Sequence, residues 1–443
     1  MDFKFSKTVK TLSYLALFLV PILTVLLVIY YHGGTLVSPL LACILCVPLE
    51  AALFFLIGYV LISKKNGRPV FQKKIPLIVA VLVAVACVAF CVLLYGPFAG
   101  FKNWLITTAM STMSHQHYCQ WFYSEEEIKS VLGQNYVEEV DEKTDTDMIE
   151  SDADKNAQAE KIDDYIAINK AREEADAYNA SLTEGVVAET STYKLIRLRV
   201  NGQVAYLACV YDASKVQVAY TNKMGTSGQY VTKMAELKGA VLGINGAGFY
   251  DPGANSSGAT PGGLTIAGGK VITNNGFHGY SGGGLIGFNN ENVLCLMKNA
   301  TAESALAAGI RDAVSWGPFL VVNGKSSYVS GNGGWGLAAR TAIGQTADGT
   351  VLLLVVDSNS TRSKGATMKD LADIMISYGA VNAANLDGGT STVMVMPSDA
   401  ALAVNPKAKT DGYSTKYRII NDPVDSALQH KTRPIADAWV VLP

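Results

Sequence analysis

The sequence predicts an α+β domain with a mixed sheet, preceded by three transmembrane helices and an acidic helical or flexible connector. Three long apolar runs lie before residue 100, and an acid-rich stretch follows them. From about Ser191, short β-rich runs alternate with glycine turns. We therefore predict a membrane anchor over residues 1–100, an interfacial segment and acidic connector over 101–190, and a globular domain over 191–443.

Each apolar run is long enough for a helix to cross about 30 Å of hydrocarbon. The runs cover Leu12–Tyr31, Leu36–Ile62 and Ile75–Tyr95. Lysines precede the first run, and lysines and an arginine fill the loop between the second and third, whereas His32–Thr35 contains neither. The N-terminus is then expected to be cytoplasmic and the C-terminal domain extracellular, at the cell membrane. A secretory signal is the alternative interpretation of the first run.

Composition excludes two classes of protein. The 443 residues carry a formal net charge of −2, so binding of nucleic acid through bulk positive charge is not expected. Only Cys119, Cys209 and Cys295 of the seven cysteines lie outside the spans, which excludes a disulfide framework. Residues 124–185 hold 19 Asp or Glu against 6 Lys or Arg, and we interpret them as a solvated spacer that buries little apolar surface.

One segment of the outer domain predicts a β-α-β unit. Val351–Val356 is an apolar run typical of a strand buried on both faces. A helix is expected from Thr367 to Gly379, and a second strand over about 381–386. We expect the two strands to be parallel neighbours, with Asp357 and Asp387 opening on the same sheet edge. The alternative is that both are ordinary turn aspartates.

Two glycine-rich turns and two arginines complete the candidate site. Asp387 lies in the run Asn385-Leu-Asp-Gly-Gly-Thr-Ser-Thr392, where glycines allow close approach and N–H groups and hydroxyls favour anionic oxygens. The candidate binding residues there are Asn385, Gly388, Gly389, Ser391 and Thr392. Asn245 opens a similar turn, and Arg340 and Arg433 are candidate phosphate clamps. A surface ion pair is the alternative for each arginine.

These segments resemble, in order, the motifs of the phosphodiester glycosidase family. Arg340–Gly349 matches the pattern R-T-A-I-G-x-x-x-D-G, and Asn385–Thr392 resembles N-L-D-G-G-G-S-S-T with Thr390 in place of the third glycine. The remaining similar segments are Asn245–Asp251, Pro261–Lys270, Trp316–Lys325, Gly365–Thr367, Asn421–Pro423 and Arg433. Animal members of the family uncover mannose 6-phosphate by removing N-acetylglucosamine, and many bacterial members were first labelled exopolysaccharide biosynthesis proteins.

The resemblance implies hydrolysis of a sugar-1-phosphodiester at the anomeric carbon, on a cell-envelope glycan or glycosyl phosphate. Asp387 is then the expected catalytic carboxylate and Asp357 the second, while Arg340 holds phosphate and Asn245 positions the sugar phosphate. Asp357-Ser-Asn replaces the common D-G-R, and Arg362 nearby is a candidate substitute for the missing arginine.

No cofactor or metal is expected. A divalent cation near Asp251, Asp357 or Asp387 is chemically reasonable, but the spacing does not support one. The expected partners are the carbohydrate or glycosyl-phosphate substrate and the lipid bilayer, and the sequence does not identify the protein partners.

Two other functions stay open at this point. The first is a non-catalytic module that binds anionic cell-wall or exopolysaccharide polymer. The second is a phosphodiesterase that cuts the P–O bond instead of the bond to the sugar.

Overall fold

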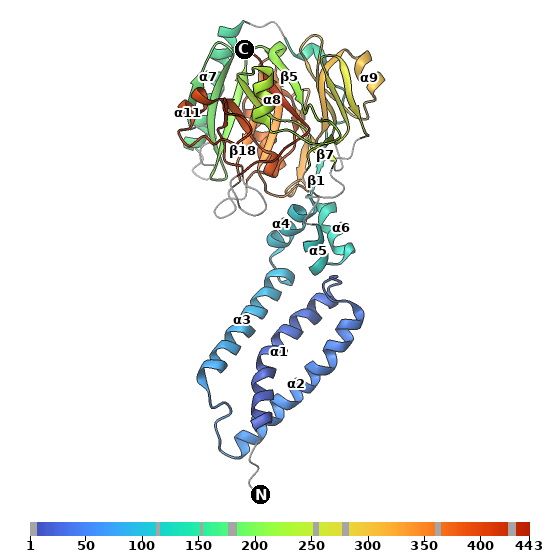
Figure 1. The fold of residues 1–443 in the computed structure, drawn as a ribbon, viewed down its shortest axis with the longest axis vertical. Coiled ribbons are helices and arrows are strands. Elements are labelled where there is room, and N and C mark those ends of the chain that lie inside the picture. The colour runs from blue at the N-terminus through green and yellow to red at the C-terminus, as the bar shows by residue number, and fades with distance from the viewer. Residues whose placement is uncertain are drawn as a thin grey trace. The chain divides into compact units, whose positions relative to one another are not determined.

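The computed structural model describes residues 7–111, 116–150, 154–175, 184–250, 257–276, 283–358, 365–423 and 431–443. The chain divides into two compact units, residues 1–134 and 135–443. Figure 1 shows the ribbon of both units, each of which is described by itself below. The predicted α+β class is confirmed, with long apolar helices first and a sheet-rich unit after them.

The first unit contains the predicted apolar helices. Three helices are long and apolar enough to cross a membrane: α1 (Lys7–Tyr31), α2 (Pro39–Lys65) and α3 (Lys74–Tyr95). Three shorter helices follow: α4 (Ala99–Met110), α5 (Gln116–Phe122) and α6 (Glu125–Gln134). The turn between α1 and α2 bonds to α5, because the Thr35 amide donates to the Gln120 carbonyl at 2.7 Å. The Tyr123 hydroxyl donates to the Leu94 carbonyl near the end of α3.

The second unit is built on an eight-stranded sheet in which every described pair is antiparallel. Its strands, in spatial order, are β15 (Lys325–Ser326), β14 (Phe319–Val322), β19 (Ala380–Asn385), β17 (Arg340–Thr346), β18 (Val351–Val356), β4 (Gln203–Val210), β3 (Tyr193–Val200) and β2 (Gly185–Glu189). The prediction that β18 and β19 are direct neighbours is wrong, because β17 lies between them. Both are antiparallel to β17, so they still run in the same direction.

Two five-stranded sheets complete the unit. The first contains β10 (Lys270–Asn274), β9 (Leu264–Ala267), β13 (Ile310–Trp316), β11 (Gly284–Asn289) and β12 (Leu294–Met297). The second contains β21 (Tyr417–Ile419), β20 (Met394–Pro397), β6 (Leu242–Asn245), β22 (Asp437–Val441) and β5 (Val216–Tyr220). Two short pairs are β1 (Tyr136–Glu138) with β16 (Tyr328–Ser330), and β7 (Phe249–Tyr250) with β8 (Thr260–Pro261). Strands of all three larger sheets contribute side chains to one large apolar core.

Five helices pack around these sheets: α7 (Lys155–Ala175), α8 (Val231–Lys238), α9 (Ala302–Ala307), α10 (Met368–Ser377) and α11 (Ser398–Val404). Helix α10 is the helix predicted between β18 and β19. Thr367 and Asp370 form the predicted capping box, and Gly379 follows the helix with φ +80°. Leu371 and Met375 are fully buried, so the predicted apolar stripe is confirmed.

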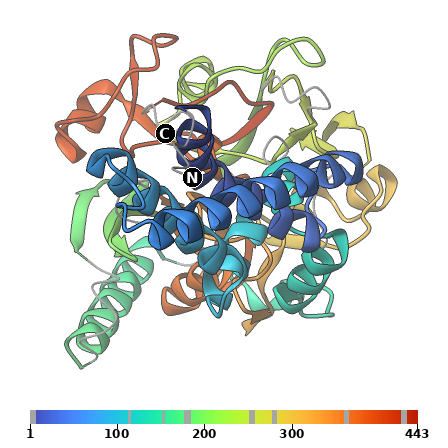
Figure 2. The ribbon, with the colours of Figure 1, turned by 90° about the horizontal axis from the view of Figure 1, so that it is seen from below.

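Much of the acidic connector is folded onto the second unit. Helix α7, the long helix at the edge of this unit in Figure 2, buries Ile162 and Ile166 in the main core. Its Asp163 carboxylate pairs at 2.6 Å with the buried Lys194 ammonium. The helical part of the prediction is confirmed, but the interpretation as a solvated spacer is wrong for this stretch. Its charges face water while regularly spaced apolar residues face the sheet.

We call residues 135–150, which precede α7, the strap. The strap adds β1 to β16, and its Glu139 carboxylate accepts hydrogen bonds from the Gly283 and Phe319 amides. The Thr144 hydroxyl lies 2.9 Å from the Leu296 amide and 3.2 Å from its carbonyl. These contacts make the strap part of the second unit and not a free linker.

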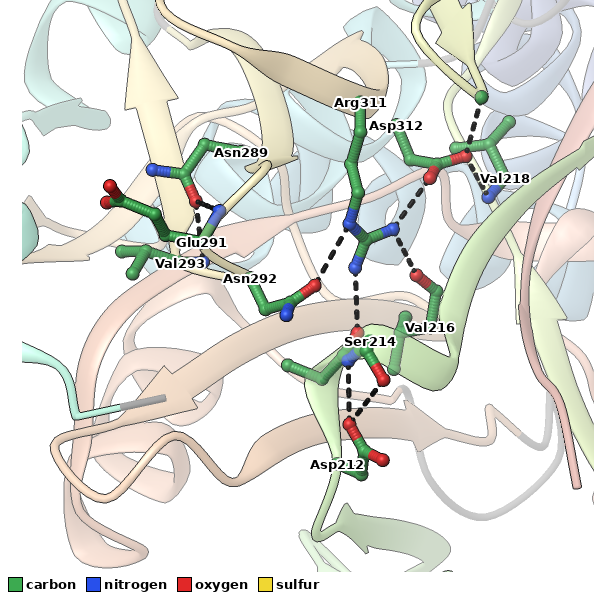
Figure 3. Close-up of polar contacts among 12 residues, drawn as sticks. Asp212, Ser214, Val216, Val218, Asn289, Glu291, Asn292, Val293, Arg311 and Asp312 are labelled. Atoms are coloured by element: carbon green, nitrogen blue, oxygen red, sulfur yellow. Dashed lines mark hydrogen bonds and ion pairs between the residues drawn. The ribbon is translucent and has the colours of Figure 1, made fainter. Parts of the chain in front are cut away.

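A partly buried arginine on β13 links two of the sheets (Figure 3). The Arg311 guanidinium donates to the Asp312 carboxylate at 2.6 Å, to the Asn292 side chain, and to the carbonyls of Ala213 and Val216. Asp312 in turn accepts the Val218 amide at 3.0 Å. The charges of Arg311 and Asp312 therefore both have polar partners, as burial of charge requires.

Candidate active site

The edge of the eight-stranded sheet brings the predicted residues together. Arg340, the first residue of β17, pairs in register with Val356 at the end of β18, and Ala342 pairs with Asn385 at the end of β19. Asp357 and Asp387 follow these strand ends. The expected placement of both aspartates on one edge, beside Arg340, is therefore confirmed, although the strands are not neighbours.

Asp387 is partly exposed and is influenced by the charges of two arginines. Burial raises the pKa of its carboxyl above the ordinary value, and the Arg433 charge, the Ser391 side chain, the Gly388 amide and the Arg340 charge oppose that rise. The Gly388 amide donates to its Oδ1 at 2.9 Å. A carboxyl with a raised pKa beside positive charges is a candidate for proton transfer with water or substrate.

Arg433 is the more exposed of the two arginines. It is half-buried, whereas Arg340 is only 4% exposed. Its Nε donates to the Ser391 hydroxyl at 3.0 Å, and its guanidinium carbon lies 5.2 Å from the centre of the Phe249 ring. After burial, its charge has the largest influence on the pKa of Asp387. Arg433 is thus well placed to hold an anionic group beside the Asp387 carboxylate.

Arg340 is held mainly by backbone carbonyls. Its Nε donates to the Ala366 carbonyl at 3.2 Å, and its Nη2 donates to the carbonyls of Trp335 and Gly336. The Nη1 atom lies nearest the Asp387 turn, 3.4 Å from the position that a Cβ on Gly388 would occupy. Burial lowers the pKa of Arg340 to about 10, and the Asp387 charge opposes this effect. Its charge therefore acts on Asp387, while most of its described hydrogen bonds fix its own position.

The glycine turn after Asp387 holds this residue in place. Gly389, with φ +61°, donates its amide to the Ala339 carbonyl, and the amides of Ser391 and Thr392 donate to carbonyls within the turn. The Gly388 amide is bonded to the Asp387 carboxylate itself. The backbone amides of Gly388, Gly389, Ser391 and Thr392, which were expected to bind an anion, thus already donate to acceptors within the protein. The Ser391 side chain is fully buried, but its hydroxyl links Asp387 to Arg433.

Asn245 and Asn385 are buried residues whose side chains bond to the backbone around the site. The Asn245 amide donates to the Asp387 carbonyl at 2.8 Å, and its oxygen accepts the Thr341 hydroxyl at 2.7 Å and the Val393 amide. The Asn385 amide donates to the Gly317 carbonyl at 2.7 Å. Both side chains are fully buried. Their contacts point to positioning of the Asp387 turn and not to direct contact with a ligand.

Asp357 lies on the same edge but has different partners. Its carboxylate accepts the Asn421 side-chain amide at 2.8 Å and the Asp422 backbone amide at 2.9 Å. Burial raises its pKa to about 6, which these two hydrogen bonds oppose. Asn421 also donates to the Thr392 carbonyl at 3.0 Å, so Asp357 reaches the Asp387 turn through Asn421.

Sequence reasoning missed Asp437, a fully buried carboxyl directly behind the site. Its Oδ1 accepts the Ala247 amide at 2.8 Å and its Oδ2 accepts the Thr265 hydroxyl at 3.1 Å. Burial raises its pKa to about 7, the Asp387 charge adds to the rise, and the two hydrogen bonds oppose it. The available signal was an acid inside the otherwise apolar strand Ala436-Asp-Ala-Trp-Val-Val441.

Two glycines of the Asn245 turn are explained by close packing against protein groups. A Cβ on Gly246 would lie 2.3 Å from the Asp437 carboxylate, and one on Gly248 would lie 2.0 Å from the Trp316 ring. Neither position tolerates a side chain. Two residues from the sequence analysis, Asp251 and Arg362, lie outside the described residues.

Residues 238–442 match the family model for phosphodiester glycosidases. The chain is 30% identical over 188 residues to the prophage-derived protein YomE of Bacillus subtilis (strain 168), covering 41% of this chain and 28% of that protein. It is 38% identical over 60 residues to N-acetylglucosamine-1-phosphodiester alpha-N-acetylglucosaminidase of Bos taurus, covering 14% of this chain and 11% of that enzyme. It therefore spans well under half the length of these relatives.

Among solved structures, the chain is similar to the zebrafish N-acetylglucosamine-1-phosphodiester alpha-N-acetylglucosaminidase catalytic domain, described as auto-inhibited by its pro-peptide. The TM-score is 0.44 at 18% identity, covering 60% of this chain and 87% of that chain. The matched family model includes every site residue named above, from Asn245 to Asp437. The resemblance noted in the sequence is thereby confirmed: residues 238–442, a little under half of the chain, match the phosphodiester glycosidase family model.

Proposed function

We propose that this protein is a membrane-anchored, extracytoplasmic hydrolase of a sugar-1-phosphodiester bond in a cell-surface glycan or glycosyl phosphate. The observation that carries the proposal is the position of Asp387. Its partly exposed carboxyl, with a raised pKa, lies under the influence of the Arg433 and Arg340 charges, within a phosphodiester glycosidase domain.

The reaction breaks the bond between the anomeric carbon and the bridging oxygen, which leaves with the phosphate. Water supplies the oxygen that ends on the sugar, and its proton passes through the Asp387 carboxylate to the released phosphate or to solvent. Asp387 activates this water or stabilises the oxocarbenium-like centre. Arg433, with its Nε on Ser391, stabilises the charge on the leaving phosphate, which is a weak base that needs little acid assistance.

The remaining site residues have positioning roles in this proposal. The position of Asp387 relative to the arginines is fixed by Asn245, Asn385 and the turn from Gly388 to Thr392. Asp357 does the same through Asn421, and it is the second carboxylate available to the reaction. Arg340 supplies a fixed positive charge behind the carboxylate.

The membrane part of the proposal is supported by α1, α2 and α3, whose length and composition suit spanning segments. Basic residues before α1 and between α2 and α3 favour the cytoplasm for both segments. The second unit, which follows α3 in the chain, then lies outside the cell.

The decisive experiment is hydrolysis of a sugar-1-phosphodiester by the purified full chain in ¹⁸O-labelled water. We expect the label in the sugar and none in the phosphate. Asp387→Asn should abolish turnover while binding of the substrate persists. Asp373→Asn is the control, because Asp373 is an exposed aspartate that pairs with Lys369 on α10.

Two results would overturn the proposal. Label in the phosphate would show P–O cleavage, the reaction of a phosphodiesterase. Binding of anionic glycan without any product, across a panel that includes nucleotide sugars and teichoic-type polymers, would show a binding module.

A further inference from the structure

The place where the chain joins the second unit lies next to the candidate site. Asn135, the first residue of the strap, accepts the Asn332 amide at 3.1 Å through its side chain. Its carbonyl oxygen lies 2.5 Å from the position that a Cβ on Gly334 would occupy. Trp335 follows directly, and its carbonyl accepts a hydrogen bond from Arg340. Gly334, which lies against Asn135, is therefore the direct neighbour of Trp335, a residue that holds Arg340.

The other end of this connection lies at the ends of the apolar helices. Tyr123, just before α6, forms a backbone bridge with Gly33 in the turn between α1 and α2 and bonds to Leu94 near the end of α3. Helix α6 has ten residues and is thus about 15 Å long. Along the chain, only α6 and Asn135 connect the ends of the proposed spans to the edge of the site.

An exposed aromatic pair marks the same part of the second unit. Tyr136 on β1 and Tyr328 on β16 are 42% and 61% exposed, and their ring centres lie 6.4 Å apart. Tyrosine is enriched where protein meets the headgroup layer of a membrane, because its ring is apolar and its hydroxyl is polar. Tyr136 directly follows Asn135, the first residue of the strap.

We propose that the substrate is a glycosyl phosphodiester carried on a membrane lipid, with the sugar on one side of the phosphate and the lipid alcohol on the other. This deepens the proposed function and rests on it. Headgroups occupy only the outer several ångströms of a bilayer. A site tied to the spans by about 15 Å of helix therefore suits a phosphodiester at the lipid surface better than one far out on a polymer. Hydrolysis releases the free sugar and leaves a phosphate monoester on the lipid.

The test uses the full chain reconstituted in phosphatidylcholine vesicles. Two substrates with the same sugar are compared: a sugar-1-phosphodiester of a polyprenyl alcohol in the same vesicles, and a water-soluble sugar-1-phosphodiester of a short alkyl alcohol. A rigid spacer of four Glu-Ala-Ala-Ala-Lys repeats between Gln134 and Asn135 then moves the site about 30 Å further along the chain.

We expect the spacer to lower release of sugar from the lipid-linked substrate by about tenfold or more, because it removes the high local concentration that the short connection provides. Hydrolysis of the soluble substrate should stay within about twofold, since the site itself is unchanged. Tyr328→Ser should also slow the lipid-linked reaction selectively. Tyr413→Ser is the matched control, because Tyr413 is equally exposed at 61% and stacks on Tyr230 in another part of the unit.

The outcomes separate this proposal from the proposed function. Suppose that the anchored protein hydrolyses the soluble substrate, and that the spacer slows hydrolysis of both substrates equally or of neither. The proposal of a lipid-linked substrate is then refuted, while the proposed hydrolase activity stands. If neither substrate yields free sugar, the proposed function is refuted, and so is this inference, which rests on it.

Discussion

Replacing Asp437 with asparagine removes a buried carboxyl and keeps its shape. The carbonyl oxygen of the new side chain can still accept the Ala247 amide, and its NH₂ group can donate to the Thr265 hydroxyl. The main change is therefore the loss of a titratable group at a fully buried position.

The magnitude follows from the pKa of Asp437. It rises from 3.8 to about 7 on folding, because burial penalises the charged form. A pKa difference of one corresponds to about 1.4 kcal/mol, so the upper limit is about 4 kcal/mol. The folded state keeps this proton between pH 4 and 7 while the unfolded chain has lost it. The free energy of unfolding of the wild type should therefore fall as pH rises through this window and level off above it.

The assay is urea unfolding of the detergent-solubilised full chain at pH 4, 6 and 8, followed by near-ultraviolet circular dichroism. We expect Asp437→Asn to match the wild type at pH 4 and to be more stable at pH 8, by up to about 4 kcal/mol. Some pH dependence should remain in the variant, because the pKa of Asp357 is also raised, to about 6. Asp373→Asn should stay within about 0.5 kcal/mol of the wild type at every pH. A variant that is less stable than the wild type at pH 8 would refute the reasoning.

Four further outcomes are expected. Turnover should fall as pH drops through the raised pKa of Asp387, and kcat against pH should place this acidic limb above that of an ordinary aspartate. Arg433→Ala should raise KM for the phosphodiester by about tenfold to a hundredfold, through loss of about 1.5–3 kcal/mol of charged hydrogen bonding, and inorganic phosphate should inhibit the variant less. Arg311→Ala should cost about 3–5 kcal/mol in urea unfolding, because it leaves the buried Asp312 carboxylate without its positively charged partner. Gly248→Ala should lower both Tm and kcat, since its methyl group would meet the Trp316 ring.

Local signals in the sequence were sufficient for several elements. The apolar run of β18 and the capping box and apolar stripe of α10 are present in the structure as expected. The shared edge of Asp357 and Asp387 also follows from local order, because a strand, a helix and a second strand return the chain in the same direction. The strand and helix predictions each depend on residues within about ten positions of one another, and the shared edge depends only on the order of these three elements.

Long-range pairing accounts for what the sequence did not show. The strand between β18 and β19 is β17, which precedes both in the chain, and no local signal says that it inserts there. The acid count of the connector concealed Ile162 and Ile166, whose i, i+4 spacing buries one face of α7. The roles of Gly246 and Gly248 were equally hidden, because they depend on Asp437 and Trp316 far along the chain.

The strap decides where a soluble version of this protein has to begin. A truncation at residue 191 would discard Glu139 and leave the amides of Gly283 and Phe319 without their carboxylate acceptor, beside the corner that carries Trp316. It would also expose the core surface that α7 covers. Expression from Asn135 keeps these contacts and the pairing of β1 with β16, and it omits α1, α2 and α3.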